Sequence, residues 1–387
     1  MNALRTLISD RIRSHGPISV AEYIDLALYH PSHGYYACAS RRTGRAGDFL
    51  TSVDVGPIFG ALLARQFAEM WQILESQITK PEPRIPNPEP RLFHLVEAAA
   101  GDGRLARDIL DAAAGQHADL YASMRLHLID ASTAARAAQV ETLGPHVHIL
   151  ASSSDALPDS VEGAIFANEL LDALPTHAVV MRKEGLREMF VDVRGDELVP
   201  HEATPSTPAL ANYLDRAGVR LKIGWRAEIN LRAIEWVRRA ARVLRRGFLV
   251  LIDYGHEAAE LYSATHAAGT LATFHRHVSS DWHSLLEDPG ERDITAHVDL
   301  STVTRVCEEE GLVTLGRLDQ TYFLLGLGLG DMLGTSSGST PAELKTRLAF
   351  KTLMLPGGLG STLKVLIFGK DVGVPALQGL SYGGRLT

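Results

Sequence analysis

The stretch that decides the fold reads LFHLVEAAAGDGRL and spans Leu92–Leu105. An apolar run ends in Glu97 and is followed by small residues, by the pair Gly101 and Gly103, and by a helical pattern. This order is typical of a buried strand, a tight turn and a helix start. Glycine lets the backbone turn sharply and approach a ligand closely. The first N–H groups of the helix then offer donors to that ligand.

A second acidic residue follows the next predicted strand, because the run Arg125–Ile129 leads directly into Asp130. Nucleotide-binding folds hold the ribose hydroxyls with an acid at this position. The dinucleotide fingerprint G-x-G-x-x-G is incomplete here, because the third glycine is missing. Glu97 would repel a pyrophosphate but attract a cationic amino group. The residues therefore favour S-adenosylmethionine as the cofactor, and an ordinary strand–helix turn is the alternative.

Composition sets the limits on size, partners and compartment. A chain of 387 residues with 45% hydrophobic residues predicts one large domain with insertions or two ordinary domains. The net charge of −8, without a long basic block, argues against a nucleic-acid partner. Cys38 and Cys307 are too far apart for a metal motif and predict free thiols in a reducing compartment. Without a long apolar segment or a signal peptide, we expect no membrane insertion and a cytoplasmic location.

The chain is expected to have two parts. Residues 1–90 form an N-terminal helical region, in which Ser19 is a helix N-cap. Residues 91–387 alternate between strands and helices, which predicts a Rossmann-like, mostly parallel α/β sheet with insertions at about 176–224 and 255–300. The predicted parallel strands are Leu92–Glu97, Arg125–Asp130, Val147–Leu150, Gly163–Asn168 and Phe248–Tyr254.

Other patterns add detail to the second part. Alternating residues in Ala178–Glu202 predict a β-hairpin or meander. A helix is expected over Trp225–Arg245, because its last turn is cationic and Gly247 could cap it. A further helix is expected near Leu300–Gly311. Two late apolar runs predict an antiparallel strand pair at Val313–Leu318 and Leu363–Phe368.

A glycine-rich loop at Gly44–Ser52 precedes the predicted sheet. In one interpretation it is a lid over the cofactor, in which Gly47 permits close approach and Asp48 or Thr51 makes a polar contact. The alternative is a loop that only packs against the first helices.

Acidic and amide side chains follow the fourth predicted parallel strand. Ligands in open α/β sheets bind outside the carboxyl ends of the strands, where Asn168, Glu169 and Asp172 lie. Carboxylates there suit a cationic acceptor such as a guanidinium group. Asp172 could instead cap the next helix. Farther along, His256 is more readily a structural residue than a general base, and Asp293–Asp299 lacks a recognised ligand spacing, so no metal site is predicted.

Taken together, the motifs resemble the MidA-like methyltransferase family. The resemblance extends from about residue 16 to residue 370. It rests on PISVAEYIDLALYHPSHGYY, GRAGDFLTS, LVEAAAGDGRLARDIL, ANELLDALPTHAVV, LVLIDYGHE, GTLATFHRH, DPGERDITAHVD and FLLGLGL, all in the family's order.

The resemblance implies a class I methyltransferase that uses S-adenosylmethionine and has a seven-stranded sheet. A mitochondrial member of the family is similar to type II protein arginine methyltransferases and modifies a subunit of respiratory complex I. A protein substrate, and more narrowly a respiratory-complex subunit, is therefore implied. The resemblance implies cofactor contacts at four residues: Glu97, Gly101, Gly103 and Asp130. It places Gly47 and Asp48 in a lid over the cofactor. It implies contacts with the methyl acceptor at Asn168, Glu169 and Asp172.

The chain departs from the family pattern at the glycine turn, where Ala99, Ala100 and Asp102 replace Gly, Pro and Arg. Ala99 would be strained if its φ were positive, and Asp102 adds a negative charge. Ser52–Pro57 also departs from the family's lid sequence. A non-catalytic binding protein and a small-molecule methyltransferase therefore stay open as alternatives. The acceptor protein, the number of methyl groups and the oligomeric state, including a homodimer, are also open.

Overall fold

The computed structural model describes residues 2–38, 51–76, 91–275, 278–280, 284–334, 351–353 and 362–383. The chain forms two compact units. Unit 1 takes its described residues from Met1–Phe49, Leu170–Val237 and Tyr254–Val306. Unit 2 takes its described residues from Leu50–Glu169, Arg238–Asp253 and Cys307–Thr387.

The large sheet has the strand order β15-β16-β10-β5-β2-β3-β4. Its strands are β2 (Phe93–Ala98), β3 (Met124–Ile129), β4 (Leu150–Ser154), β5 (Val161–Asn168), β10 (Leu244–His256), β15 (Val313–Asp319) and β16 (Leu363–Lys370). The pairs that join β4, β3, β2, β5 and β10 are parallel, and β15 is antiparallel to β16. The predicted α/β class with a mostly parallel sheet is confirmed. The expected number of seven strands is not confirmed, because the short β14 (Val298–Asp299) also pairs with β10 and brings the described sheet to eight strands.

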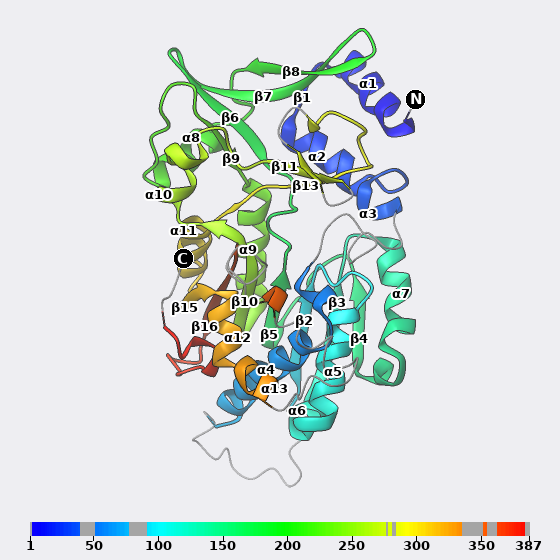
Figure 1. Ribbon diagram of the computed structural model, residues 1–387, viewed down its shortest axis with the longest axis vertical. Coiled ribbons are helices and arrows are strands. Elements are labelled where there is room, and N and C mark those ends of the chain that lie inside the picture. The colour runs from blue at the N-terminus through cyan, green and yellow to red at the C-terminus, as the bar shows by residue number, and fades with distance from the viewer. Residues whose placement is uncertain are drawn as a thin grey trace. The chain divides into compact units, whose positions relative to one another are not determined.

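Helices of unit 2 pack against its strands and against each other. α4 (Ile58–Ser76) lies beside α5 (Arg104–Gln116) and contacts β5 (Figure 1). Phe67 of α4 and Phe166 of β5 are fully buried with ring centroids 5.1 Å apart. The described residues 51–76, which were expected in the N-terminal helical region, belong to unit 2. The other helices here are η1 (Ser52–Val55), α6 (Ala118–Ser123), α7 (Thr133–Leu143), η2 (Gly144–Ile149), α12 (Gln320–Gly326), α13 (Leu329–Gly334) and η5 (Gln378–Leu380).

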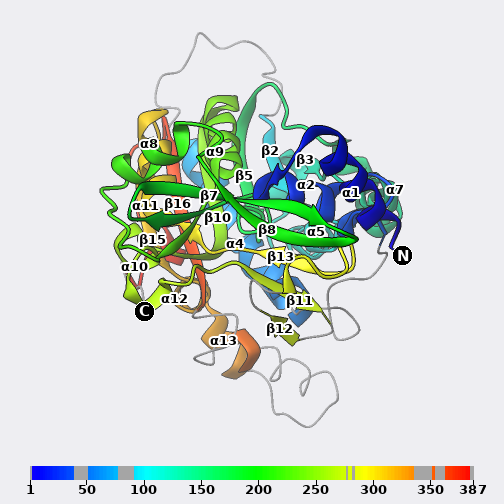
Figure 2. The same ribbon diagram turned by 90° about the horizontal axis from the view of Figure 1, so that it is seen from above.

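Unit 1 joins the N-terminal helices to an antiparallel sheet. Ser19 caps α2 by accepting the Glu22 N–H, as predicted. The predicted meander is confirmed, because β7 pairs antiparallel with both β6 and β8. Figure 1 labels all three strands, and Figure 2 shows β7 and β8 from above. These elements are α1 (Ala3–His15), β1 (Ile18–Ser19), α2 (Val20–Tyr29), β6 (His177–Arg182), β7 (Gly185–Arg194), β8 (Glu197–Ala203) and β9 (Arg226–Ile229). Their buried core includes Leu4, Ile8, Ile24, Val180 and Val191.

The remaining elements belong wholly or in part to unit 1. They are α3 (Tyr35–Cys38), α8 (Ala209–Arg216), α9 (Leu231–Val243), α10 (Ala258–Leu261), η3 (Ala264–His266), β11 (Ala272–His275), β12 (Val278–Ser280), β13 (Asp293–Thr295) and α11 (Leu300–Glu309). The predicted helix near Leu300–Gly311 corresponds to α11 and is confirmed. Within the described ranges, every helix is too short or too polar to span a bilayer.

Three local predictions are wrong. Val147–Leu150 was expected to be a strand, but η2 occupies most of it and β4 begins at Leu150. The helix expected over Trp225–Arg245 is shorter, because β9 pairs with β6 before α9 begins. Gly247 is not a helix cap and lies within β10, opposite Gly163. In the second and third cases long-range strand pairing overrides a local pattern.

Replacing Gly247 by alanine should lower the free energy of unfolding by about 3 kcal/mol or more. Gly247 has φ +132°, and an added Cβ would lie 1.9 Å from the carbonyl oxygen of Gly163. Gly115→Ala is the matched control, because Gly115 lies in α5 with no described atom within 4 Å of an added Cβ. It should stabilise the protein by about 0.5–1 kcal/mol. Urea unfolding measures both, and equal midpoints would contradict the backbone clash.

Candidate active site

The glycine turn joins β2 to α5 as predicted. Gly101 has φ +53° and Gly103, the N-cap of α5, has φ +87°. Both conformations favour glycine because L side chains rarely adopt them. An added Cβ at Gly101 would meet no described atom within 4 Å, so the main chain borders open space at this point.

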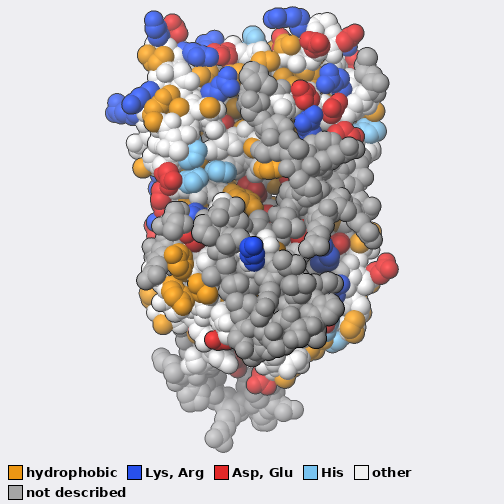
Figure 3. Space-filling model, viewed as in Figure 1, with side chains coloured by type: hydrophobic (Ala, Val, Ile, Leu, Met, Phe, Trp, Pro, Cys, Tyr) orange, Lys and Arg blue, Asp and Glu red, His pale blue; other side chains and the backbone are white. Residues whose placement is uncertain are grey.

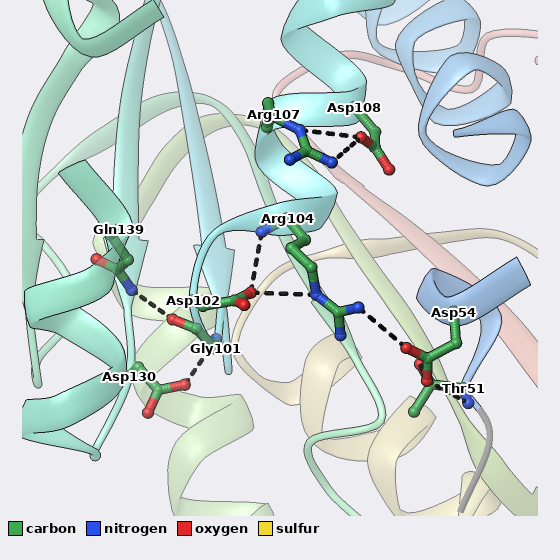
Figure 4. Close-up of polar contacts among 9 residues, drawn as sticks. All are labelled: Thr51, Asp54, Gly101, Asp102, Arg104, Arg107, Asp108, Asp130 and Gln139. Carbon is green, nitrogen blue, oxygen red and sulfur yellow. Dashed lines mark hydrogen bonds and ion pairs between the residues drawn. The ribbon is translucent and has the colours of Figure 1, made fainter. Parts of the chain in front are cut away.

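Asp130 holds this turn in place. One of its carboxylate oxygens accepts the Gly101 N–H at 2.8 Å (Figure 4). The other accepts the Ser132 N–H at 2.8 Å. Burial raises the pKa of Asp130, and these two N–H groups act in the opposite direction. Parallel pairing of β2 with β3 places Ala98 opposite Ile129, so the two strands end together. The structure thus brings together Gly101 and Asp130, which the sequence singled out separately.

A buried glutamine, Gln139, also supports the turn. Its side-chain N–H donates to the Gly101 carbonyl at 2.9 Å (Figure 4). Its oxygen accepts the Ser153 hydroxyl at 2.6 Å. The side chain is fully buried in α7. The sequence did not indicate Gln139, because a single polar residue in a helical pattern does not reveal which group it will bind.

Glu97 is a buried carboxylate near the end of β2. It is 4% exposed, and its Oε2 atom has no hydrogen-bond partner among the described residues. Burial raises its pKa well above the ordinary value, and the charges of Asp102 and Asp130 add to that effect. A carboxylate in this state is stabilised by a cation, since a charge in a buried position needs a partner.

Asp102, which replaces the arginine of the family pattern, forms an ion pair with Arg104 at 3.3 Å. Arg104 also reaches Asp54 of η1 at 3.1 Å (Figure 4). The expected added negative charge is therefore partly balanced at its own position. This bridge links the residues after the predicted lid to the start of α5, and the sequence did not predict it.

The predicted lid is described only at its end. The Thr51 hydroxyl donates to Asp54 Oδ2 at 2.9 Å, and the Thr51 N–H donates to the same atom at 3.1 Å. Thr51 therefore caps η1, and its contact with a cofactor stays a prediction. Gly47 and Asp48 lie outside the described residues.

Asn168 and Glu169 lie at the carboxyl end of β5. The register places Ala167 opposite Ala98 of β2, so Asn168 lies next to the start of the glycine turn. The Asn168 Nδ2 group donates to Glu169 Oε1 at 3.0 Å. Asn168 Oδ1 is buried without a hydrogen-bond donor among the described residues. Glu169 has φ +54°, a strained conformation for a residue other than glycine, and such strain is concentrated at functional sites.

Asp172 belongs to unit 1, whereas Asn168 and Glu169 belong to unit 2. Its carboxylate accepts the Thr295 hydroxyl at 2.9 Å, and its backbone carbonyl accepts the Ala296 N–H at 3.1 Å. The structure therefore gives Asp172 contacts with the segment around β13. Its predicted contact with an acceptor stays a prediction.

Residues 62–318 match a protein family described as "Putative S-adenosyl-L-methionine-dependent methyltransferase". The match covers more than half of the chain. The chain belongs to this family.

Named relatives agree with this membership. The mitochondrial protein arginine methyltransferase NDUFAF7 of Mus musculus is 29% identical over 378 residues, covering 90% of this chain and 80% of the relative. The homologue from Drosophila melanogaster is 28% identical over 402 residues, covering 91% and 85%. Because these relatives are mitochondrial proteins, the predicted cytoplasmic location is wrong. Cysteine content and apolar segments report on redox conditions and membrane insertion, and neither identifies a compartment.

A solved structure extends the similarity to the whole fold. A Burkholderia thailandensis protein bound to S-adenosyl-homocysteine has a TM-score of 0.87 and 29% identity, covering 99% of this chain and 95% of that one. The predicted resemblance to methyltransferases is confirmed. The protein is a methyltransferase, and its cofactor is S-adenosylmethionine.

In this methyltransferase, replacing Ala99 by glycine should raise the free energy of unfolding by about 0.5–1 kcal/mol. Ala99 has φ +57° and an exposed side chain, so glycine relieves backbone strain without removing core packing. Ala100→Gly is the control. Ala100 is buried and is not among the residues with positive φ, so it should lose stability instead. Thermal unfolding measures both, and stabilisation by both variants would show that the strain at Ala99 is not the cause.

Proposed function

We propose that this methyltransferase transfers methyl groups to arginine side chains of a protein. The acceptor groups at the end of β5 carry the proposal. Asn168 Oδ1 is a buried acceptor without a donor among the described residues, and it lies next to the Glu169 carboxylate. A guanidinium group offers five N–H donors and a positive charge, which suits such a pair. The names of the relatives, protein arginine methyltransferases, support the same acceptor.

The residues of the glycine turn fit the cofactor. Glu97 would hold the ammonium group of its methionine part, because Oε2 is buried without a partner among the described residues. Asp130 would accept the ribose hydroxyls, since each of its oxygens accepts one N–H and retains a second lone pair. Gly101 and Gly103 would let the main chain approach the ligand.

The chemistry needs alignment and a place for one proton. S-adenosylmethionine, when bound, supplies a methyl group on a positively charged sulfur. Glu169 would hold the guanidinium group, orient one nitrogen toward that methyl group and accept the proton released from this nitrogen on a carboxylate oxygen. Asn168 would fix the carboxylate through its amide N–H and accept a second guanidinium N–H on Oδ1.

A peptide library with one central arginine in varied contexts tests the acceptor. The full chain should transfer labelled methyl groups to these peptides and not to the same library with lysine at that position. Mass spectrometry identifies the modified residue. Methylation of lysine would overturn the proposal. If the protein binds S-adenosylmethionine in a calorimeter but methylates no peptide, the proposal is also overturned. A small-molecule acceptor would then be favoured.

Finer points stay predictions. They are the closing of Gly47 and Asp48 over the cofactor, a contact of Asp172 with the acceptor, a respiratory-complex subunit as the substrate, and a homodimer.

A further inference from the structure

Three histidines of unit 1 that have no part in the proposed methyl transfer come together. His256 ends β10, His266 ends η3, and His297 lies between β13 and β14. One nitrogen from each ring lies within 4.8 Å of the other two. The ring centroid of His256 lies 4.8 Å from that of His266 and 5.0 Å from that of His297. Three separate segments therefore present imidazole nitrogens to one point.

Hydrogen bonds to Glu260 orient two of these rings. His266 Nδ1 lies 3.1 Å from the Glu260 backbone carbonyl, which can only accept, so Nδ1 carries the proton and Nε2 carries the lone pair. His256 Nδ1 lies 3.2 Å from the Glu260 carboxylate. The His256 Nε2 atom accordingly faces His297, 3.1 Å from its Nδ1 atom. Histidines that ligate metals typically donate their other ring N–H to a carboxylate or a carbonyl in this way.

The third ring, His297, lies between β13 and β14, where its backbone N–H donates to the Thr270 hydroxyl at 3.1 Å. All three side chains are partly exposed, so an ion and a water molecule have access to them. Figure 3 shows histidine side chains gathered at the surface, to the left of that view.

We propose that His256, His266 and His297 bind one divalent transition-metal ion of the zinc class. The ligand atoms would be Nε2 of His256, Nε2 of His266 and Nδ1 of His297. Zn–N bonds of about 2.0–2.1 Å in a tetrahedron place ligand nitrogens about 3.3 Å apart. His256 and His297 are already close to this separation. His266 would move inward by up to about 1.5 Å to complete this spacing, since the three nitrogens lie within 4.8 Å of one another.

Three histidines and water give the ion four ligands, with one exchangeable position. Imidazole ligands suit zinc, copper and nickel better than magnesium or calcium. The bound ion would cross-link the end of β10, η3 and the β13–β14 connection. An ion that binds only the folded state stabilises that state, so we expect Tm to rise when the metal is added.

Calorimetric titration of the chelator-treated full chain with Zn²⁺ tests the site, and Co²⁺ serves as a spectroscopic probe of four-coordination. We expect one equivalent to bind with a Kd below about 1 μM, and Tm to rise by roughly 5 °C at saturation. His266→Asn should weaken binding at least 100-fold and abolish the Tm shift. Glu260→Gln should weaken binding about 10–100-fold, because Glu260 positions His256.

His148→Asn is the matched control. His148 is an exposed histidine in η2 whose Nδ1 also lies near a backbone carbonyl, that of Pro145, at 2.9 Å. It should leave Zn²⁺ binding unchanged. Binding of S-adenosylmethionine verifies that each variant is folded. If His266→Asn does not fold, Glu260→Gln is the variant that tests the site. Absence of stoichiometric binding, or equal affinity in folded His148→Asn and Glu260→Gln, would overturn the proposal.

Discussion

S-adenosylmethionine binding should be lost, or weakened at least about 100-fold, when Glu97 is replaced by glutamine. Glu97 Oε2 is buried without a hydrogen-bond partner among the described residues. Burial raises the pKa of Glu97, so its negative charge is unfavourable unless a cation is bound. Glutamine keeps the size of the side chain but removes that charge. It would also turn an N–H donor toward the ammonium group. Calorimetry with S-adenosylmethionine and S-adenosylhomocysteine measures the loss, because both carry this ammonium group.

The raised pKa of Glu97 gives the same prediction a pH dependence. A bound cation lowers this pKa, so cofactor affinity should increase as the pH rises through the raised pKa of the free protein. Folding stability should change in the opposite direction. The folded protein holds the Glu97 proton more tightly than the unfolded chain, so this stability is present at low pH and is lost as the pH rises through the raised pKa. Glu97→Gln should remove both dependences and be the more stable protein at pH 8.

Glu162→Gln is the control for Glu97, because Glu162 is exposed on the neighbouring strand β5. It should leave affinity, stability and their pH dependence unchanged. Cofactor affinity in Glu97→Gln within threefold of the unmodified protein would show that Glu97 does not hold the ammonium group.

Methyl transfer should fall by about 10²–10⁴ in kcat when Glu169 is replaced by glutamine, with cofactor affinity unchanged. Glu169 is proposed to hold the guanidinium group and accept its proton, and an amide can do neither. Glutamine keeps the side-chain length and the positive φ of +54°, so the loss cannot come from altered backbone strain. Single-turnover kinetics with an arginine peptide measures the chemical step, and calorimetry measures cofactor binding.

A comparison of kcat with stability distinguishes a residue that acts on the acceptor from one that only supports the fold. Glu169→Gln should lower kcat without changing the urea unfolding midpoint, whereas a purely structural loss would lower the midpoint as well. Glu162→Gln again serves as the control, because it lies at the opposite end of β5. Full activity in Glu169→Gln would exclude the residue as the acceptor contact.

The cofactor end of the fold could be predicted from the sequence because its signals are local. The strand–turn–helix at Leu92–Leu105 and the acid after the next strand follow from apolar runs, glycines and the ends of strands. The structure then shows that Gly101 and Asp130 meet. The β9 strand could not be predicted in this way, because Arg226–Ile229 becomes a strand only by pairing with β6.

The sequence by itself determined the α/β class with a mostly parallel sheet and the methyltransferase family. Only the tertiary structure decided which side chains support and extend those parts. Gln139 reaches Gly101, Arg104 joins Asp102 to Asp54, and three histidines meet in unit 1. Except for Asp102 and Arg104, these partners lie on separate elements, so no local pattern records them. The reason is physical: a local pattern fixes an element and its buried face, whereas long-range pairing and packing determine which polar groups on different elements meet.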